Sequence, residues 1–529
     1  MLYTVLRTLI VALGCTAAGV ATMHMLQAQR YQIPELRRLL RRYGDKTLRP
    51  DVLIAAAVAV IDWYLPILLA MVIQKEEFRE DLCRWLVLGL FAIVAAVLFW
   101  LRLRLPMKKP FVVTRRMFRL ILLVFSINLA GCIILPLLSI TPYLLFAGAD
   151  YIVLAAAVML RPLEDRINAG FYNSARSKLA KRSDMIRIGI TGSFGKTACK
   201  QILKTLLSEK YRVLATPPSF STAMGVSRVV NEQLKPEHQV FIAEMGARHV
   251  GDIRELVDLV HPSIGLITSV GPQHLDTFGT VERVRDTKYE LIEGLPQEGI
   301  AVFARDGAHC DALYARCPLA AKYRPGDLVE ASGVEAGPWG TRFTLTDVQT
   351  GESRQMETRL LGEHSIANLL LCCTAAKALG MTLEEIALGV SRCEPVEHRL
   401  QLISGAGGVS IIDDAFNANP VGVQAALRVL KHFPGRRIIV TPGMVELGGR
   451  EEEFNRAFGT QMASSVDIAI LVGKKHTRPI AEGLLAAGFD ESNLHVVGCL
   501  GESTELLHTM MRAGDVVLYE NDLPDNYSE

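Results

Sequence analysis

Hydrophobic residues in the first 160 positions form long runs that polar residues rarely interrupt. A helix of about 20 apolar residues spans the roughly 30 Å hydrocarbon core of a bilayer. Runs near this length lie at residues 7–28, 51–73, 85–101, 118–138 and 142–160. The pattern predicts about five membrane helices, and the short Ser-Ile-Thr-Pro link before the last run predicts a helical hairpin there.

From Met185 onward the pattern changes to short apolar runs, IRIGIT, YRVLAT, QVFIAEM and IGLITSV, separated by helical stretches. Strands that alternate with helices indicate βαβ units and a mainly parallel sheet covered on both faces. We therefore predict an α/β protein. Its predicted parts are a transmembrane region at 1–161, an amphipathic linker at 162–183, a P-loop domain at 184–391 and a second, Rossmann-like domain at 392–529.

The predicted linker combines aromatic and basic residues. Phe171 and Tyr172 precede four basic residues within positions 173–182. This mixture suits an amphipathic helix that lies at the inner membrane surface. It suits a plain linker helix equally well, so the pattern leaves both alternatives open.

The basic residues of the loops predict an orientation in the membrane. Residues 30–49 and 102–119 each carry seven Lys and Arg, whereas residues 74–84 carry three basic and four acidic residues. Because cytoplasmic loops are enriched in Lys and Arg, we expect a multi-pass protein of the inner (plasma) membrane, with its N-terminus outside and everything after residue 161 in the cytoplasm. The alternative, a cleaved secretory signal within 1–28, would place the second half outside, away from ATP.

The composition agrees with a chain that lies partly in lipid. A mean hydropathy of +0.25 and 50% apolar residues are high values for a wholly soluble protein. The 57 Lys and Arg nearly balance the 55 Asp and Glu, so the global charge predicts no nucleic-acid partner. The 10 cysteines form neither a CxxC pair nor a His-Cys cluster, and we expect reduced, mostly buried thiols.

The strongest local signal is the segment IGITGSFGKT at 188–197, in which an apolar strand runs into a turn and then a helix. The turn residues are Gly192, Ser193, Phe194 and Gly195. The backbone N–H groups of such a turn bind phosphate, Lys196 would meet the β- and γ-phosphate oxygens of a nucleotide, and Thr197 would offer its hydroxyl to Mg²⁺. The alternative is an ordinary strand-to-helix turn with a solvated lysine.

Further motifs within residues 185–450 follow in the order of one family. They are TPPSFSTAMG at 216–225, AEMG at 243–246, ITSVGPQHLDTFG at 267–279, KYE at 288–290, GEHSIAN at 362–368, His398-Arg399 and DDAFNANP at 413–420. With the 191–197 segment, these motifs resemble those of the Mur ligases, and DDAFNANP resembles most closely the members that add D-alanyl-D-alanine. The resemblance implies a Mur-ligase central domain at 184–391, a Mur-ligase C-terminal domain at 392–529, and ATP and Mg²⁺ as cofactors.

An amide ligase of this type transfers the γ-phosphoryl group of ATP to a carboxylate, and an amine then attacks the acyl phosphate. Charge builds up on the phosphoryl oxygens, so the site needs cations held in fixed positions. Glu244 ends the apolar strand QVFIAEM, at the sheet edge where a metal-binding carboxylate belongs. We predict Thr197 and Glu244 as metal ligands, with a helix cap or a surface acid as the alternative role of Glu244.

The resemblance implies roles that pattern alone leaves open. His274 resembles the family's second metal ligand, and Lys288 resembles a lysine that is carbamylated and so supports Mg²⁺. Arg399 resembles an arginine that meets the phosphates when the C-terminal domain closes. The implied catalytic residues are thus Lys196, Lys288, His274 and Arg399. For His274, Lys288 and Arg399 the alternatives are a hydrogen-bonding histidine, a solvated lysine and a surface ion pair.

The resemblance also implies nucleotide contacts outside the turn. Asp414 resembles an acid that contacts the ribose, and Asn417 falls in the loop that follows it. His364 and Asn368 share one helix face in a region that the family places beside the nucleotide, although Ser365 stands where an Asn is usual. The asparagines have ordinary turn roles as their alternative.

Three departures from the family pattern concern the rest of the substrate. The N-terminal domain that holds the UDP-sugar has no counterpart, Ala304 stands where an Asn near the adenine is usual, and the chain ends in ENDLPDNYSE without the usual Lys-Gly-Ser ending. We therefore expect a cell-wall precursor carboxylate presented at the lipid bilayer, and an amino-acid or dipeptide amine as the second substrate.

Two other functions remain as alternatives. A membrane-bound ligase of the poly-γ-glutamate type would use the same chemistry, and DDAFNANP argues against it. An ATPase that drives transport or sensing belongs to another class, and the sequence lacks the LSGGQ-like signature that this class predicts.

Overall fold

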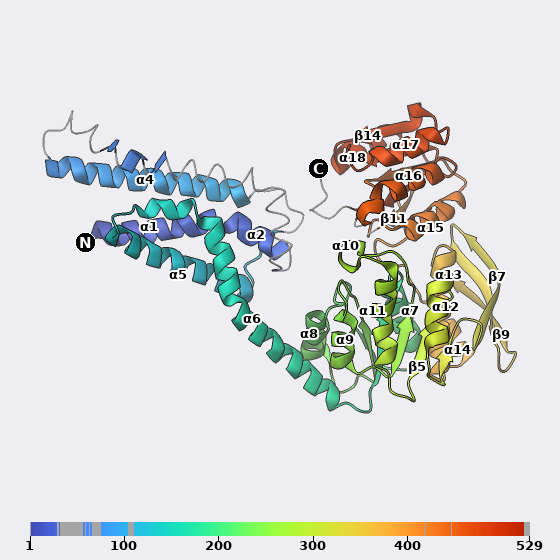
Figure 1. Ribbon diagram of the computed structural model, residues 1–529. Helices are drawn as coiled ribbons and strands as arrows, with labels where there is room; N and C mark the ends of the chain where they lie inside the picture. Colours follow the sequence, from blue (N-terminus) through green and yellow to red (C-terminus); the bar gives the residue numbers. More distant parts are fainter. Residues whose placement is uncertain are drawn as a thin grey trace. The chain divides into compact units, whose positions relative to one another are not determined.

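The computed structural model describes residues 2–28, 31, 57–58, 60–62, 64–65, 76–103, 110–416, 418–445 and 447–522. The chain divides into two compact units, Met1–Asn168 and Ala169–Glu529. The first unit is helical, and the second contains two large α/β sheets, drawn from green to red in Figure 1.

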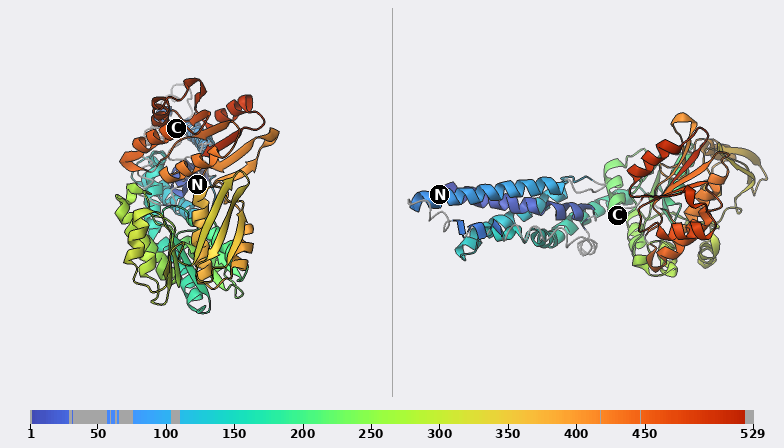
Figure 2. Two further views of the ribbon diagram at one scale, coloured as in Figure 1. Left: turned by 90° about the vertical axis from the view of Figure 1, so that its right-hand side faces the viewer. Right: turned by 90° about the horizontal axis from the view of Figure 1, so that it is seen from above.

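The first unit is a bundle of helices. They are α1 (Leu2–Ala18), α2 (Val20–Ala28), α4 (Glu76–Leu103), α5 (Arg115–Leu137), the 3-10 helix η1 (Pro142–Phe146) and the first part of α6 (Ala149–Ala180). Helix α1 packs along both α4 and α5, and Figure 2 shows these helices side by side. The ring of Phe91 contacts the rings of Tyr143 and Phe146 in the core of the bundle.

Three helical stretches of the described residues, Leu2–Ala28, Asp81–Leu103 and Arg115–Leu137, are long and apolar enough to cross a membrane. The first buries most of its surface against other helices of the bundle, whereas the other two leave most of theirs exposed. The predicted run at 51–73 lies largely outside the described residues, and the run at 142–160 comprises η1 and the first turns of α6. The count of about five helices therefore stays a prediction.

The first α/β sheet has six parallel strands in the order β2-β3-β1-β4-β5-β6. They are β1 (Ile186–Thr191), β2 (Val213–Ala215), β3 (Val240–Glu244), β4 (Ile264–Ile267), β5 (Ile300–Phe303) and β6 (Lys322–Tyr323). Strand β3 is buried at every position, because a parallel sheet is covered on both faces. The predicted α/β class is confirmed.

Helices cover both faces of this sheet. The bounds are α7 (Lys196–Leu207), α8 (Ala223–Gln233), α9 (Asp252–Val260), α10 (Leu275–Phe278), α11 (Val281–Glu293), α12 (Gly307–Arg316), α13 (Glu363–Ala378) and α14 (Leu383–Ser391). Helices α8, α9, α11 and α12 share one apolar core with the end of α6, and α7, α13 and α14 share the other. A small antiparallel sheet of β7 (Val329–Gly337), β8 (Gly340–Asp347) and β9 (Ser353–Thr358) adds to the second core.

The second α/β sheet has the order β10-β11-β15-β12-β13-β14, with only β10 antiparallel to its neighbour. Its strands are β10 (Gln401–Ser404), β11 (Ser410–Asp414), β12 (Arg437–Thr441), β13 (Ile468–Val472), β14 (Leu494–Val497) and β15 (Val516–Glu520). Helices α15 (Pro420–Lys431), α16 (Glu451–Met462) and α17 (Arg478–Ala486) pack on one face, and α18 (Leu500–Met510) packs on the other.

The predicted chemistry lies at the carboxyl ends of these strands. Strand β1 ends just before Gly192 and β3 ends at Glu244, while β11 ends at Asp414 beside Glu520, the last residue of β15. Ligands of open α/β sheets bind in the crevice outside this edge. Each sheet therefore presents its polar strand ends where a substrate would lie.

The packing of α16 on α17 depends on two glycines that approach the facing backbone. A Cβ atom at Gly459 would overlap the carbonyl oxygen of Ile480, and one at Gly483 would overlap that of Arg456. We expect Gly459→Ala to lower the free energy of unfolding by about 1–3 kcal/mol, because backbone on both sides must shift. Urea denaturation would measure it, with Gly501→Ala on α18 as the control, since the nearest atom to a Cβ there, Cys499 Sγ, is 3.7 Å away. Equal stability of the two variants would contradict the prediction.

Candidate functional site

The turn between β1 and α7 is built around two glycines. Gly192 has φ +154° and Gly195 has φ +78°. A Cβ atom at Gly195 would lie 2.6 Å from Asn368 Oδ1, and one at Gly192 would overlap the Thr268 hydroxyl. Any larger residue would therefore push the turn away from β4 and α13, and the glycines let it fold tightly at the start of α7.

The strand-end segment of β4 holds the turn in place. The N–H of Ser193 donates to the Ser269 carbonyl (2.9 Å), and the N–H of Phe194 donates to the Ser269 hydroxyl (2.7 Å). The N–H of Gly271 donates to Ser193 Oγ at 3.0 Å. The N–H groups of Ser193 and Phe194 thus already have partners within the protein. An incoming phosphate would therefore meet chiefly the N-terminus of α7 and the side chains there.

Lys196 is partly buried and folds back over the turn. Its Nζ donates to the carbonyls of Gly192 (2.6 Å) and Ser193 (3.0 Å). Loss of solvent around the ammonium, opposed by Glu244 and assisted by Arg399, lowers the pKa of Lys196 to about 8. The Lys196 ammonium is poorly solvated and has only neutral carbonyl groups as hydrogen-bond partners. Both conditions favour binding of an anion by this ammonium.

Glu244 lies beside the first turn of α7. Both of its carboxylate oxygens are 3.1 Å from Thr197 Oγ1, and Oε2 is 2.6 Å from the Nζ of buried Lys200. The backbone N–H of Glu244 donates to Thr216 Oγ1 at 3.1 Å. The two predicted metal ligands Thr197 and Glu244 thus lie side by side.

His274 and Lys288, the other predicted metal ligands, belong to the segment after β4. His274 precedes α10 with a left-handed φ of 51°. Lys288 lies in α11 with 1% of its surface exposed, and burial, together with the positive charge of Lys196, moves its pKa well below the ordinary value for lysine. The neighbouring Glu290 caps α9 by accepting from the N–H groups of Gly251 (3.1 Å) and Arg254 (2.8 Å).

The donor set fits Mg²⁺ that is also bound by phosphate. Mg²⁺ prefers oxygen ligands and usually takes only one or two carboxylates from the protein in nucleotide sites. The Thr197 hydroxyl and the Glu244 carboxylate supply such oxygens. Throughout the described ranges, no three His, Cys, Asp or Glu side chains gather as a complete metal site.

Arg399 links the two α/β sheets electrostatically. The charges of Glu244 at the end of β3 and of Asp414 at the end of β11 both act on its guanidinium, while burial lowers its pKa. Its guanidinium carbon lies 4.7 Å from the centre of the Phe416 ring. The flanking residues His398 (φ 59°) and Leu400 (φ 44°) are both left-handed, a strained conformation for side chains of this size.

Asp414 forms a buried acidic pair with Glu520. Asp414 Oδ1 accepts from the Leu400 N–H at 3.1 Å, and burial raises the pKa of Asp414 to about 6. Glu520 has 1% of its surface exposed, and burial together with Asp414 raises its pKa well above the usual range. The pair therefore retains a proton at a pH where ordinary carboxyl groups have lost theirs.

Of the remaining residues predicted near the nucleotide, some lie close to the turn and others fall outside the described residues. Asn368 lies behind the turn, with its Oδ1 3.3 Å from Cys199 Sγ, so it supports Gly195 from the side of α13. Asn417 lies outside the described residues, as does the side chain of His364. Ala304, where the family pattern has an Asn, follows β5 and donates its N–H to the Ile267 carbonyl at 2.9 Å.

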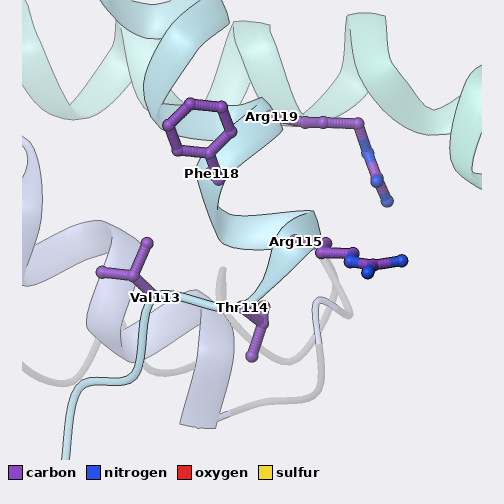
Figure 3. Close-up of a pocket in the computed structure, with 5 residues that line it drawn as sticks. All are labelled: Val113, Thr114, Arg115, Phe118 and Arg119. Carbon is purple, nitrogen blue, oxygen red and sulfur yellow. The ribbon is translucent and has the colours of Figure 1, made fainter.

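A shallow pocket in the first unit includes none of the predicted site residues. Its lining is Val113, Thr114, Arg115, Phe118 and Arg119, at the start of α5 (Figure 3). Arg119 donates to both carboxylate oxygens of Glu164, at 2.7 and 2.9 Å. This basic side chain is therefore neutralised within the bundle.

The sequence patterns missed Lys200, Ser269 and Glu520. Lys200 stands one helical turn after Lys196 among the buried residues of α7, and a charge within an apolar helix face was the available signal. Ser269 and Glu520 act through strand neighbours that are far away in the sequence, and no local pattern marks them.

Two family profiles match the chain. The Mur ligase middle domain matches residues 190–376, and the Mur ligase glutamate ligase domain matches residues 398–519. The UDP-N-acetylmuramoyl-tripeptide–D-alanyl-D-alanine ligase of Escherichia coli is 31% identical over 306 residues, which are 56% of this chain and 67% of the relative. The enzyme of the same name from Mycobacterium tuberculosis is 32% identical over 366 residues, 63% of this chain and 69% of the relative.

Solved structures show the same fold. MurF from Acinetobacter baumannii superposes with a TM-score of 0.61 at 24% identity, covering 68% of this chain and 78% of the other. MurF ligase from Thermotoga maritima in complex with ADP gives 0.59 at 24% identity, with 67% and 80% covered.

The predicted location as a multi-pass inner-membrane protein with an external N-terminus is wrong. The UDP-N-acetylmuramoyl-tripeptide–D-alanyl-D-alanine ligases that match the chain are soluble cytoplasmic enzymes. The physical reason is that an apolar run signals a hydrophobic surface without saying what covers it: Leu2–Ala28 is covered mostly within its own bundle, whereas Asp81–Leu103 and Arg115–Leu137 are mostly exposed. A lipid bilayer as partner and the absence of a nucleic-acid partner stay predictions.

The acidic pair predicts an unusual dependence of stability on pH. The folded protein keeps a proton on Glu520 that the unfolded chain loses above its ordinary pKa of about 4.5, so this pair should lose stability as the pH rises from 5 to 8. Glu520→Gln mimics the protonated form, and its stability relative to wild type should therefore grow over that interval. Urea denaturation at both pH values measures this, with exposed Glu505→Gln as the control; a relative stability that is the same at pH 5 and pH 8 would contradict it.

Proposed function

The chain belongs to the Mur ligase family, and we propose that it joins D-alanyl-D-alanine, or a similar amine, to the free carboxylate of a UDP-N-acetylmuramoyl-tripeptide. Mur ligases are ATP-dependent amide ligases that use Mg²⁺, and this chain is an enzyme of that class. The names of the matched relatives and the DDAFNANP segment support the D-alanyl-D-alanine substrate.

One arrangement carries the proposal: Lys196 lies over the turn that precedes the Thr197–Glu244 pair, and the charge of Glu244 acts on both Lys196 and Arg399. The two cations come from different α/β sheets, one from the turn after β1 and one from the segment before β10. Two fixed positive charges beside one carboxylate suit a polyphosphate, because its charge grows on the transferring oxygens.

The reaction needs two displacements. The acceptor carboxylate attacks the γ-phosphorus of ATP, the bond to the β-phosphate oxygen breaks, and ADP leaves an acyl phosphate behind. The amine nitrogen then attacks the acyl carbon, the bond to the phosphate oxygen breaks, and phosphate leaves with the amide formed. We assign Lys196 to the β- and γ-phosphate oxygens, which replace the carbonyls of Gly192 and Ser193 as its partners, and Arg399 to the transferring phosphoryl group.

We assign Thr197, Glu244, His274 and a carbamylated Lys288 to the support of Mg²⁺. When bound, Mg²⁺ would neutralise part of the negative charge of the phosphates. Thr197 and Glu244 hold their oxygens side by side, and burial lowers the pKa of Lys288, which favours the uncharged amine that reacts with CO₂. A carbamate there would also gain from the nearby positive charge of Lys196.

We assign the nucleotide to the turn residues Gly192 to Thr197, with Asn368 and Asp414 nearby and Asn417 as a further predicted contact. The proposed ATP-binding domain covers 184–391 and the proposed C-terminal domain covers 392–529. The two family profiles, at 190–376 and 398–519, lie within these bounds.

Lys196→Met tests the proposal. With the full-length protein, Mg²⁺, UDP-N-acetylmuramoyl-tripeptide and D-alanyl-D-alanine, we expect ADP release to fall about 100-fold or more, because a preorganised charge at the transferring phosphate is lost. The matched control is Lys204→Met, an exposed lysine two turns later on the same helix, which should keep full activity.

Two outcomes would overturn the assignment. Unchanged ADP release by Lys196→Met would remove the phosphate role of the turn. ADP release by wild type that ignores every amine and every carboxylate would point to an ATPase that drives transport or sensing. A poly-γ-glutamate-type ligase would instead show release that depends on free glutamate.

Lys288 predicts a dependence on CO₂. Depletion of CO₂ and bicarbonate should lower ADP release at neutral pH, and added bicarbonate should restore it, because the uncharged amine adds CO₂ reversibly. Lys288→Arg should have low activity that bicarbonate does not change, since a guanidinium stays protonated. ADP release in sealed, degassed buffer measures this, and wild-type activity that ignores bicarbonate would contradict it.

A further inference from the structure

Lys200 is a buried cation that no step of the proposed reaction uses. It lies on α7 one turn after Lys196, and only 2% of its side chain is exposed. Its Nζ donates to Glu244 Oε2 at 2.6 Å and to the Pro217 carbonyl at 3.2 Å. Burying a lysine is unfavourable unless it is paired, so the position of this cation depends on its contact with Glu244.

The contact divides the two oxygens of the Glu244 carboxylate. Thr197 Oγ1 lies 3.1 Å from both oxygens, and Oε2 also takes the short charge-assisted hydrogen bond from Lys200. Oε2 is therefore held by a cation and a hydroxyl, whereas Oε1 has the hydroxyl as its partner and keeps acceptor capacity for a metal ion. Rotation of the carboxylate would break the shortest of its contacts.

The same contact provides Glu244 with a permanent counter-charge. Lys196 also acts electrostatically on Glu244, but its Nζ lies on the carbonyls of Gly192 and Ser193. Because Lys200 neutralises the Glu244 carboxylate, Lys196 can bind a phosphate without leaving a buried negative charge unpaired. Lys200 also reaches Pro217, next to Thr216, whose hydroxyl accepts from the Glu244 N–H. Side chain and backbone of Glu244 are thus held by two neighbouring groups.

We propose that Lys200 is a positioning residue for the metal site: it holds Glu244 Oε2 and so fixes the carboxylate beside Thr197 with Oε1 available to the divalent cation that accompanies the nucleotide. The proposal rests on the proposed function, because it takes Thr197 and Glu244 as ligands of that cation. It adds a residue that touches neither metal nor nucleotide, and outer partners of metal ligands commonly change metal affinity 10- to 100-fold.

The test measures the affinity of Mn²⁺, a paramagnetic substitute for Mg²⁺, for the full-length protein with saturating ADP, by electron paramagnetic resonance. We expect Lys200→Met to weaken Mn²⁺ binding about tenfold or more, with a smaller change in the affinity for ADP without metal. Lys200→Arg, which keeps a cationic donor, should restore most of the affinity. Lys204→Met, on the exposed side of the same helix, should bind Mn²⁺ as wild type does.

The outcomes separate this proposal from the proposed function. Wild-type affinity for Mn²⁺ in a folded Lys200→Met variant would overturn the role of Lys200 and leave the ligase assignment intact. Absence of both Mn²⁺·ADP binding and ADP release in wild type would overturn the proposed function itself. Should Lys200→Met fail to fold, Lys200→Gln, which retains a neutral donor, takes its place: weaker Mn²⁺ binding supports the proposal and unchanged binding contradicts it.

Discussion

The Glu244 carboxylate is the group on which the arrangement of the site depends. It ends β3, holds Lys200 by a 2.6 Å contact, meets Thr197, and acts electrostatically on Lys196 and Arg399. Positive charge exceeds negative charge around it, which is unfavourable in a partly buried place unless an anion joins. The excess of positive charge at this sheet edge suits a polyanion, and a nucleotide polyphosphate has that chemistry. The parallel sheet makes this possible, because it brings the ends of β1, β3 and β4 to one edge.

Local sequence patterns predicted much of this edge correctly. The apolar run before Gly192, the small residues of the turn and the helix after Lys196 are neighbours in sequence, so their structure follows from short-range rules. Glu244 could be placed for the same reason, as the polar residue that closes an apolar strand. The α/β class follows from the alternation of such strands with helices, and the family motifs set the order of the two domains.

Groups that act across the fold were not predictable in this way. Lys200 is a charged residue on an apolar helix face, which signals burial, but only the position of β3 beside α7 shows that its partner is Glu244. Glu520 meets Asp414 because β15 inserts between β11 and β12, although the two residues are more than 100 positions apart. In the first unit, the apolar runs that fall within the described residues are helical, yet hydrophobicity alone did not say what covers them.

The backbone around Arg399 has a consequence for how the enzyme would move. His398 and Leu400 hold left-handed conformations on either side of the arginine, each unfavourable by about 1–3 kcal/mol for a residue with a side chain. This segment stores backbone strain. A contact that moved His398 or Leu400 to a more favourable φ would also change the direction of the Arg399 guanidinium. The direction of the Arg399 side chain is therefore tied to the backbone conformation of the connector between the two α/β domains.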